Sequence, residues 1–322
     1  MAGACILLYL LSTSTLGAEL HRYEYSADAM GGNFAITLYS ADRPRADAAA
    51  DAAFAELRRL DSMLSNYRTD SEWSEVNRHA AERPVEVSLE LFDLIAACLE
   101  YSRLSDGAFD ITVGPLVKAW GFHDGSGRFP DDAAAKDALA SVGYTHIRLD
   151  PGNHTVRFAR ARMEMDPGGI GKGYAIDRMI AVLKHHGIER ALLSAAGSSI
   201  YALGAPPSAD GWRVTIDAPD KPDRAACRLV LKDESLSTSG ISKKFFRVGG
   251  RTYGHIIDPR TGHPARGVLL AAVRTPRATD SEAWTKAFFV NGRNWSARHT
   301  PPGFKVFLCE EAAEHPQCGW IP

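Results

Sequence analysis

The chain has 322 residues, of which 45% are hydrophobic and 24% are charged, and its formal net charge is −2. This composition supplies enough apolar material for a large core and excludes a disordered or fibrous protein. The nearly balanced charge gives no basic surface for nucleic acid. We therefore expect a globular protein, without a nucleic-acid partner, that holds any anionic ligand through a local arrangement of residues.

Residues 1–18 combine an apolar run, Ala4 to Leu11, with the small residues that follow it. This pattern is typical of a secretory signal peptide cleaved after Ala18, and the run is shorter than the roughly 20 residues that span a bilayer. The letters AGAC around Cys5 also resemble a lipoprotein cleavage box, although no apolar segment precedes them. We expect an exported protein, in the periplasm or on the outer face of the cytoplasmic membrane, and membrane association stays open.

Helical and strand patterns alternate through residues 19–322 without a low-complexity linker, so we expect a single two-lobed domain of the α+β class. Apolar spacing and capping residues define the expected elements. In chain order these are paired strands over 22–39, helices over 44–63 and 88–104, a hairpin over 145–165, a helix over 173–186, then mostly strands, and a last helix near 280–290.

Four cysteines remain after the expected signal peptide, and only Cys309 and Cys318 are close in sequence. In an exported protein these two can form a short disulfide staple near the C-terminus. The sequence contains no C-x-x-C, H-E-x-x-H or G-x-S-x-G motif. It therefore gives no support to a zinc site, a thiol-redox site or the commonest serine-hydrolase site.

The segment MDPGGIGKGYAIDRM, residues 165–179, places Asp166, several glycines and Lys172 between an expected strand at 162–165 and a helix. Backbone N–H groups and the positive end of the dipole make a helix N-terminus attractive to anions, and glycine allows a ligand to approach closely. It is not a Walker A loop, because Lys172 is followed by glycine. A glycine-rich turn without a ligand explains the segment equally well.

Three further segments carry candidate site residues. Residues 105–122 join acidic residues to aromatic ones, and residues 64–78 contain Tyr67, which can stack on a flat ligand; core packing and helix capping explain both segments as well. The segment TYGHIIDPRTGHP gathers His255, Asp258 and Arg260 on one loop. A turn does not require a histidine or an arginine there, which favours a functional role.

The chain resembles the FAD:protein FMN transferases, the ApbE-like flavin transferases, in seven segments that occur in the same order. These segments are MGGNFAI, SNYRTDSEWSEVN, GAFDITVGPLVKAWGF, MDPGGIGKGYAIDR, LSTSG, YGHIIDPRTGHP and ATDSEAWTKAFFVNG. The resemblance extends over about residues 28–295. It implies a flavin-transferase α+β fold, related to the T-fold, in which mixed antiparallel sheets pack against helices.

The resemblance also implies an activity. FAD would lie in a cleft with Mg²⁺ beside its pyrophosphate, and FMN would pass to a threonine or serine hydroxyl of an exported redox protein with release of AMP. Attack by a hydroxyl on a pyrophosphate needs aligned reactants, neutralisation of the developing charge and a base. His255 or a nearby carboxylate can serve as that base.

Carried over residue by residue, the resemblance implies a set of site residues. His255 lies in the family's H-I-I-D-P signature near the reacting phosphate, with Asp258 and Arg260 beside it as further catalytic candidates, and the backbone of Gly169 falls on a metal-ligand position. The FAD-contacting positions are Met30, Tyr67, Ala108, Phe109, Asp110, Asp166 and Lys172.

The last segment departs from the family at the metal site. Relatives bind the metal there with an aspartate and with a threonine four residues later, whereas this chain has Glu282 and Lys286, with Thr285 between them. Glutamate keeps an oxygen ligand, but an ammonium group has no lone pair and repels Mg²⁺. The segment AAGSSIYALG, residues 195–204, also lacks a carboxylate that many relatives carry.

Three interpretations of this departure stay open. Lys286 directs its charge at the phosphates and partly replaces the ion; or Asp280, Glu282 and Thr285 hold the metal while Lys286 turns away; or Glu282 and Lys286 form a surface ion pair worth about 0.2–0.5 kcal/mol in a protein that has lost transfer. The alternatives to a transferase are accordingly a pyrophosphatase that cuts FAD into FMN and AMP, and a non-catalytic flavin-binding protein.

Overall fold

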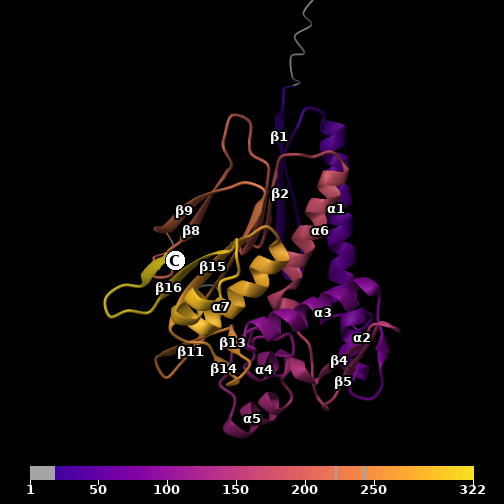
Figure 1. Ribbon diagram of the computed structural model, residues 1–322, viewed down its shortest axis with the longest axis vertical. Helices are drawn as coiled ribbons and strands as arrows, with labels where there is room; N and C mark the ends of the chain where they lie inside the picture. The colour runs from indigo at the N-terminus through magenta and orange to yellow at the C-terminus, as the bar shows by residue number, and fades with distance from the viewer. Residues whose placement is uncertain (1–18, 222, 242–243) are drawn as a thin grey trace, which may run out of the picture.

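A central antiparallel sheet organises the molecule in the computed structural model, which describes residues 19–221, 223–241 and 244–322 (Figure 1). The expected signal peptide lies outside the described residues. Eight strands form the sheet in the order β1-β2-β6-β7-β10-β15-β16-β17, and each neighbouring pair is antiparallel. Their bounds are β1 His21–Ala29, β2 Gly32–Ser40, β6 Ala191–Ala195, β7 Ser199–Leu203, β10 Glu234–Gly240, β15 Val268–Thr275, β16 Lys305–Glu310 and β17 Gln317–Trp320.

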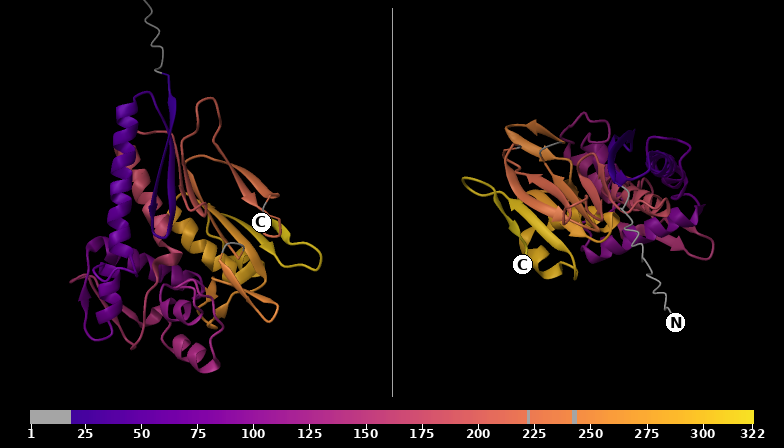
Figure 2. Two further views of the ribbon diagram at one scale, coloured as in Figure 1. Left: turned by 180° about the vertical axis from the view of Figure 1, so that it is seen from behind. Right: turned by 90° about the horizontal axis from the view of Figure 1, so that it is seen from above.

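Three long helices cover one face of this sheet: α1 (Arg43–Leu64), α6 (Gly171–His185) and α7 (Ala278–His299). Figures 1 and 2 show α1 and α6 side by side, with α1 beside the hairpin of β1 and β2. The buried residues of β2 and α1 follow the strand and helix periods, and the two elements contact each other here. Alternate residues of β2, namely Phe34, Ile36 and Leu38, are buried, and α1 buries alanines in its first turns and larger apolar side chains further on.

The opposite face is partly covered by the hairpin of β8 (Trp212–Asp217) and β9 (Ala225–Leu231). Alternate residues of β16 point to opposite faces, because Val306 and Leu308 belong to the main core whereas Phe307 and Cys309 pack with Trp212 of the hairpin. Cys309 pairs in register with Cys318 of β17, and the two are disulfide-bonded. The predicted C-terminal staple is thus confirmed.

Smaller elements gather at the lower end of the molecule in Figure 1. Trp73, Leu91 and Phe158 from this region belong to the same buried cluster as Ile36 of the central sheet, so one continuous core joins the two parts. The bounds are α2 Glu72–His79, β3 Val85–Glu86, α3 Leu89–Leu104, α4 Gly114–Ala119, α5 Asp132–Ala140, β4 Ile147–Asp150, β5 Thr155–Phe158, β11 Phe245–Val248, β12 Arg251–Gly254, β13 Ile257–Asp258 and β14 His263–Pro264. Short 3-10 helices occupy Tyr144–His146 and Pro167–Gly169.

Most of the elements expected from the sequence are present, and the ends of some of them differ from the expectation. The helices expected over 44–63 and 88–104 are α1 and α3, and Ser88 caps α3 by accepting a hydrogen bond from the N–H of Leu91. The expected strand at 162–165 is wrong, because only Glu164 makes an isolated bridge, to Val113. The hairpin over 145–165 is correspondingly shorter and consists of β4 and β5.

The last helix extends beyond its expected end near residue 290, because the chain resumes a helical course after a kink at Gly292, where φ is 73°. Beyond the kink, the N–H and guanidinium of Arg293 donate to Glu310 of β16, which anchors the second half of α7 to the sheet. Among the residues that the structure describes, no helix combines the length and apolar character needed to cross a membrane.

Helices α6 and α7 cap each other where they cross. Asp177 of α6 accepts hydrogen bonds from the N–H groups of Ala278 and Thr279 at the start of α7. In return, Glu282 of α7 accepts the N–H of Gly173 in the first turn of α6. The helices can approach this closely because Gly173 has no Cβ; an added Cβ would collide with the carbonyl oxygen of Ala278. The crossing therefore brings both helix N-termini to one place.

Replacing Gly173 by alanine is expected to lower the free energy of unfolding by about 1–3 kcal/mol, because the new methyl group overpacks this crossing. The measurement is urea unfolding followed by circular dichroism. Gly171→Ala is the matched control in the same turn, since its Cβ would meet only ordinary contacts at 3.8 and 3.9 Å. Equal unfolding midpoints for the two variants would contradict the proposed close approach.

Candidate functional site

The glycine turn before α6 is held by Asp166. Its Oδ1 accepts the N–H of Gly168 at 2.7 Å, and its Oδ2 accepts from the side chain of Asn66 at 3.0 Å. Burial raises the pKa of Asp166, against the opposing effects of Gly168, His123, Asn66 and Lys172. Because both oxygens bind the protein, Asp166 orders the turn from inside, and the turn lies at a helix N-terminus, as the sequence predicts.

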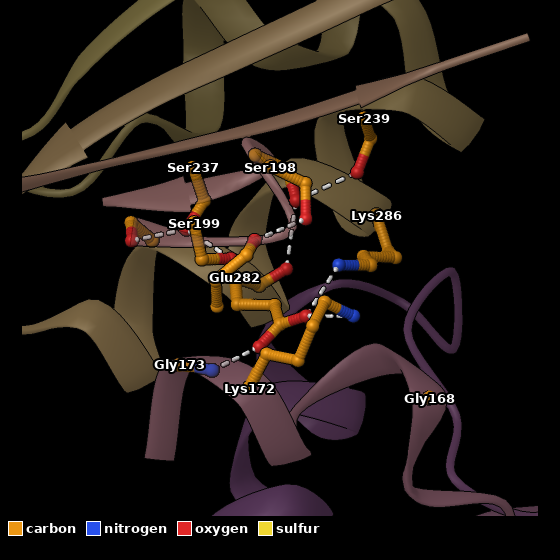
Figure 3. Close-up of polar contacts among 12 residues, drawn as sticks. Gly168, Lys172, Gly173, Ser198, Ser199, Ser237, Ser239, Glu282 and Lys286 are labelled. Atoms are coloured by element: carbon orange, nitrogen blue, oxygen red, sulfur yellow. Dashed lines mark hydrogen bonds and ion pairs between the residues drawn. The ribbon is translucent and has the colours of Figure 1, made fainter. Parts of the chain in front are cut away.

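Directly after this turn, Lys172, Glu282 and Lys286 form a compact charged group, which we call the lysine–glutamate cluster (Figure 3). The Nζ atoms of Lys172 and Lys286 lie 3.2 and 3.4 Å from the same oxygen, Oε1 of Glu282, and the other oxygen accepts the N–H of Gly173. The side chain of Glu282 is 1% exposed, whereas those of Lys172 and Lys286 are 23% and 21% exposed. The carboxylate is therefore enclosed, whereas about a fifth of each lysine side chain is exposed.

The opposite charges of this cluster favour each other's ionised forms. Burial acts to raise the pKa of Glu282, but Lys172 and Lys286 outweigh it and hold that pKa below its usual value. Burial lowers the pKa of Lys286 to about 8, although the charge of Glu282 opposes this shift. With both lysines protonated, the cluster has two positive charges and one negative charge. Its net positive charge suits an anionic ligand.

A network of hydroxyl groups fixes α7 on the sheet beneath the cluster. The Oγ of Ser281 lies 2.7 Å from the Oγ atoms of both Ser235 and Ser237 of β10, and Ser237 donates to Ser199 of β7 at 3.1 Å. The Oγ of Ser239 donates to the hydroxyl of Thr285 at 2.9 Å. Alternate serines of β10 thus face α7. The period-two pattern of the segment LSTSG could have shown this in the sequence.

The side chains here do not fit the predicted metal site of Gly169, Glu282 and Thr285. The Thr285 hydroxyl donates to the carbonyl oxygen of Glu282 at 2.7 Å and accepts from Ser239, so it turns toward the sheet. The carboxylate of Asp280 accepts from the hydroxyl of Tyr101. In the described part of the chain, no three His, Cys, Asp or Glu side chains gather in a way that could hold a metal ion.

The contacts of Glu282 also do not fit a magnesium ion. Mg²⁺ needs near-octahedral oxygen ligands, whereas Glu282 is already shared by two ammonium groups and a backbone N–H. The interpretation in which Lys286 turns away from Glu282 is wrong in this structure. The one in which Lys286 contributes its charge agrees with the geometry.

His255 lies near the cluster, on the loop after β12. Its Nδ1 is 3.1 Å from the carbonyl oxygen of Lys244, which can only accept, so Nδ1 carries the proton in this contact. Burial, the largest cause, lowers the pKa of His255 to about 4, and the charges of Lys244, Lys286 and Lys172 act in the same direction. At neutral pH the imidazole is therefore uncharged, and its Nε2 presents a lone pair. That is the form a general base requires.

Asp258 and Arg260, the other catalytic candidates, bind each other. The Nε of Arg260 lies 2.9 Å from Asp258, and its Nη1 donates to the side chain of Asn291 at 2.8 Å. An added Cβ on Gly107 would lie 3.7 Å from the Cγ of Arg260, so the pair faces the 105–110 loop. The carboxylate is thereby neutralised, which leaves His255 as the better base; catalytic roles for this pair stay a prediction.

The 105–110 loop forms a wall beside the glycine turn. An added Cβ on Gly169 would lie 3.2 Å from the ring of Phe109, which places the two segments in contact. Asp110 is 7% exposed and accepts hydrogen bonds from Thr112 and from the N–H of Tyr144. Burial raises the pKa of Asp110, opposed by these bonds. Its carboxylate therefore stabilises the loop from within, and Ala108 beside it is likewise buried.

A cleft of about 240 Å³ lies beside Tyr67 and Asp166. Tyr67 is 71% exposed and its ring stacks on that of His123, with centroids 4.6 Å apart and planes 14° apart. Two parallel rings at the rim of a cleft can bind a flat aromatic group. The cleft is lined by Asn66, Tyr67, Arg68, Thr69, Ser74, Asn77, Arg78, Gly114, Lys118, His123, Glu164, Met165 and Asp166.

The remaining predicted contact, Met30, lies in the turn between β1 and β2, where its N–H donates to Asp61 of α1. Its φ of 50° shows the tight turn that the segment MGGN forms. Sequence reasoning missed His123 and Lys244. His123 directly follows the motif GAFDITVGPLVKAWGF, whereas no sequence pattern links Lys244 to His255, because only the fold of β11 and β12 brings them together.

Known proteins of one family match most of this chain. The model of the ApbE family matches residues 30–306. A FAD:protein FMN transferase of Treponema pallidum (strain Nichols) is 33% identical over 292 residues, which cover 85% of this chain and 80% of that protein. One from Klebsiella pneumoniae (strain 342) is 32% identical over 271 residues and covers 83% and 82%.

Solved structures show the same fold. The ApbE protein of Thermotoga maritima MSB8 superposes with a TM-score of 0.83 at 30% identity, covering 93% of this chain and 96% of that one. The apo form of the flavinyl transferase ApbE of Pseudomonas stutzeri gives a TM-score of 0.83 at 27% identity, covering 94% and 95%. The predicted α+β flavin-transferase fold is confirmed, and the chain belongs to the ApbE family.

Proposed function

We propose that this protein is an FAD:protein FMN transferase, which attaches FMN from FAD to a threonine or serine hydroxyl of an exported redox protein and releases AMP. The observation that carries this proposal is the uncharged His255 beside the net positive lysine–glutamate cluster. A base and a charge-neutralising group next to each other are what phosphoryl transfer to a hydroxyl requires. The relatives described above carry the same activity in their names.

Each part of the site has a role in this reaction. The stacked rings of Tyr67 and His123 can separate to receive the flat flavin ring, while Lys172 and Lys286 bind the diphosphate. Nε2 of His255 accepts the proton of the attacking hydroxyl. The hydroxyl oxygen forms a bond to the phosphorus of the FMN half, the bond from that phosphorus to the bridging oxygen breaks, and AMP leaves with the bridging oxygen.

The acceptor and the compartment belong to the proposal. We infer export because the Cys309–Cys318 disulfide is of a kind that persists in oxidising compartments such as the periplasm. In the periplasm the enzyme would have access to an exported redox protein as acceptor. An acceptor bound to the membrane is compatible with this location. A pyrophosphatase would use the same residues with water as nucleophile, so an assay must follow both products.

The first test incubates the protein with FAD and a peptide that carries an acceptor threonine, and follows peptide mass and AMP together. We expect modified peptide and AMP in equal amounts. His255→Asn keeps a donor for the carbonyl of Lys244 and is expected to lower kcat by about 10²–10⁴-fold with little change in FAD affinity. The control is His263→Asn, an exposed histidine on β14.

In that assay, AMP without modified peptide for a range of acceptor sequences would favour the pyrophosphatase. FAD binding with neither product would favour the non-catalytic flavin-binding protein. Full activity of His255→Asn would contradict the assignment of the base.

Replacing Asp166 by alanine is expected to weaken FAD binding, because the glycine turn loses the carboxylate that holds Gly168 and Asn66. Quenching of flavin fluorescence measures the dissociation constant. Asp51→Ala is the control, since Asp51 is exposed on α1 and does not line the cleft. Unchanged affinity in Asp166→Ala would argue against the placement of the FAD site.

The stability of the free protein should also depend on His255. Its pKa falls from 6.5 to about 4 on folding, so between these values only the unfolded chain binds this proton. The free energy of unfolding therefore decreases as pH falls from 6.5 toward 4. His255→Asn should show a smaller decrease in urea unfolding between pH 7 and pH 5; equal slopes for both proteins would contradict the shift.

A further inference from the structure

The N-terminus of α6 already holds an anion that belongs to the protein. The carboxylate of Glu282 accepts a hydrogen bond from the N–H of Gly173 and is enclosed between two ammonium groups. To bind a divalent cation, this carboxylate would have to give up contacts that compensate its burial. An unpaired charge in such a place is costly. Glu282 therefore acts as a bridge that fixes the positions of Lys172 and Lys286.

The two lysines keep donors for a second anion. Each ammonium group has three N–H donors, and each makes one contact with Oε1 of Glu282. Because both contact the same oxygen atom, they lie close enough to bind neighbouring phosphate oxygens of one diphosphate. About a fifth of each lysine side chain is exposed, whereas Glu282 is enclosed.

The oxygen atoms that could complete a cation site are turned elsewhere. The hydroxyl of Thr285 binds within the layer between α7 and β10, and Asp280 binds Tyr101. A divalent cation approaching Glu282 would meet two positive charges. The same charges attract a diphosphate, whose negative charge would offset the net positive charge of the cluster.

We propose that Lys172 and Lys286, bridged by Glu282, neutralise the diphosphate of FAD directly, so that this protein binds FAD without a divalent cation. This inference rests on the proposed function, because it takes FAD as the ligand. It assigns to Lys286 the role of a binding residue and to Glu282 the role of a positioning residue.

The test measures FAD affinity by fluorescence quenching, with EDTA and with MgCl₂, for wild type and two variants. We expect equal affinity of the wild type in both conditions. Lys286→Met removes the charge and is expected to weaken binding by about tenfold to a hundredfold in both. Lys286→Thr supplies a hydroxyl group instead of the ammonium group. The FAD affinity of this variant should be lower than that of the wild type in EDTA and should recover with MgCl₂. The control is Lys184→Met, an exposed lysine at the other end of α6.

A second measurement needs no variant. Titration of the FAD-free wild type with Mn²⁺, followed by electron paramagnetic resonance, should show no specific binding. Stoichiometric Mn²⁺ binding, or an FAD affinity that requires MgCl₂, would overturn this inference and leave the transferase proposal intact. Metal-free FAD binding without FMN transfer would contradict the proposed function and leave this inference intact.

Discussion

The contact between the two N-terminal turns of α6 and α7 is the constraint on which the site depends. Gly173 allows the backbone of α6 to approach the carbonyl of Ala278, and this distance lets Glu282 reach the start of α6 and Asp177 reach the start of α7. Each helix thus satisfies N–H groups of the other that have no partner within their own helix. The lysine–glutamate cluster takes its position from this crossing.

This arrangement has an electrostatic consequence. A helix N-terminus attracts anions, yet here one of its N–H groups is bound by an internal carboxylate. Two lysines more than compensate that charge, and their field reaches His255, whose pKa they help to lower. The proposed phosphate-binding group and the proposed base are therefore electrostatically coupled. A bound diphosphate would offset the lysine charges and raise the proton affinity of His255 toward its usual value.

Much of the fold could be predicted from the sequence because its signals are local. The apolar stripe of α1, the Ser88 cap and the glycine turn before α6 depend on neighbouring residues, and the structure confirms them. The expected strand at 162–165 failed because its alternating pattern has only one bridge partner, at Val113. Beyond the kink at Gly292, Arg293 binds Glu310, which lies 17 residues away, and no local pattern indicates such a contact.

Some features of the candidate site could likewise be predicted from the sequence, and others could not. By itself the sequence determined which residues stand at the glycine turn, which loop carries His255, and that lysine occupies position 286. Only the tertiary structure decided that Glu282 also faces Lys172, that Thr285 faces Ser239, and that Asp166 is turned inward to Asn66. The physical reason is that a side chain's direction depends on partners that can be distant in the chain: Gly173 lies 109 residues from Glu282, and Asn66 lies 100 residues from Asp166.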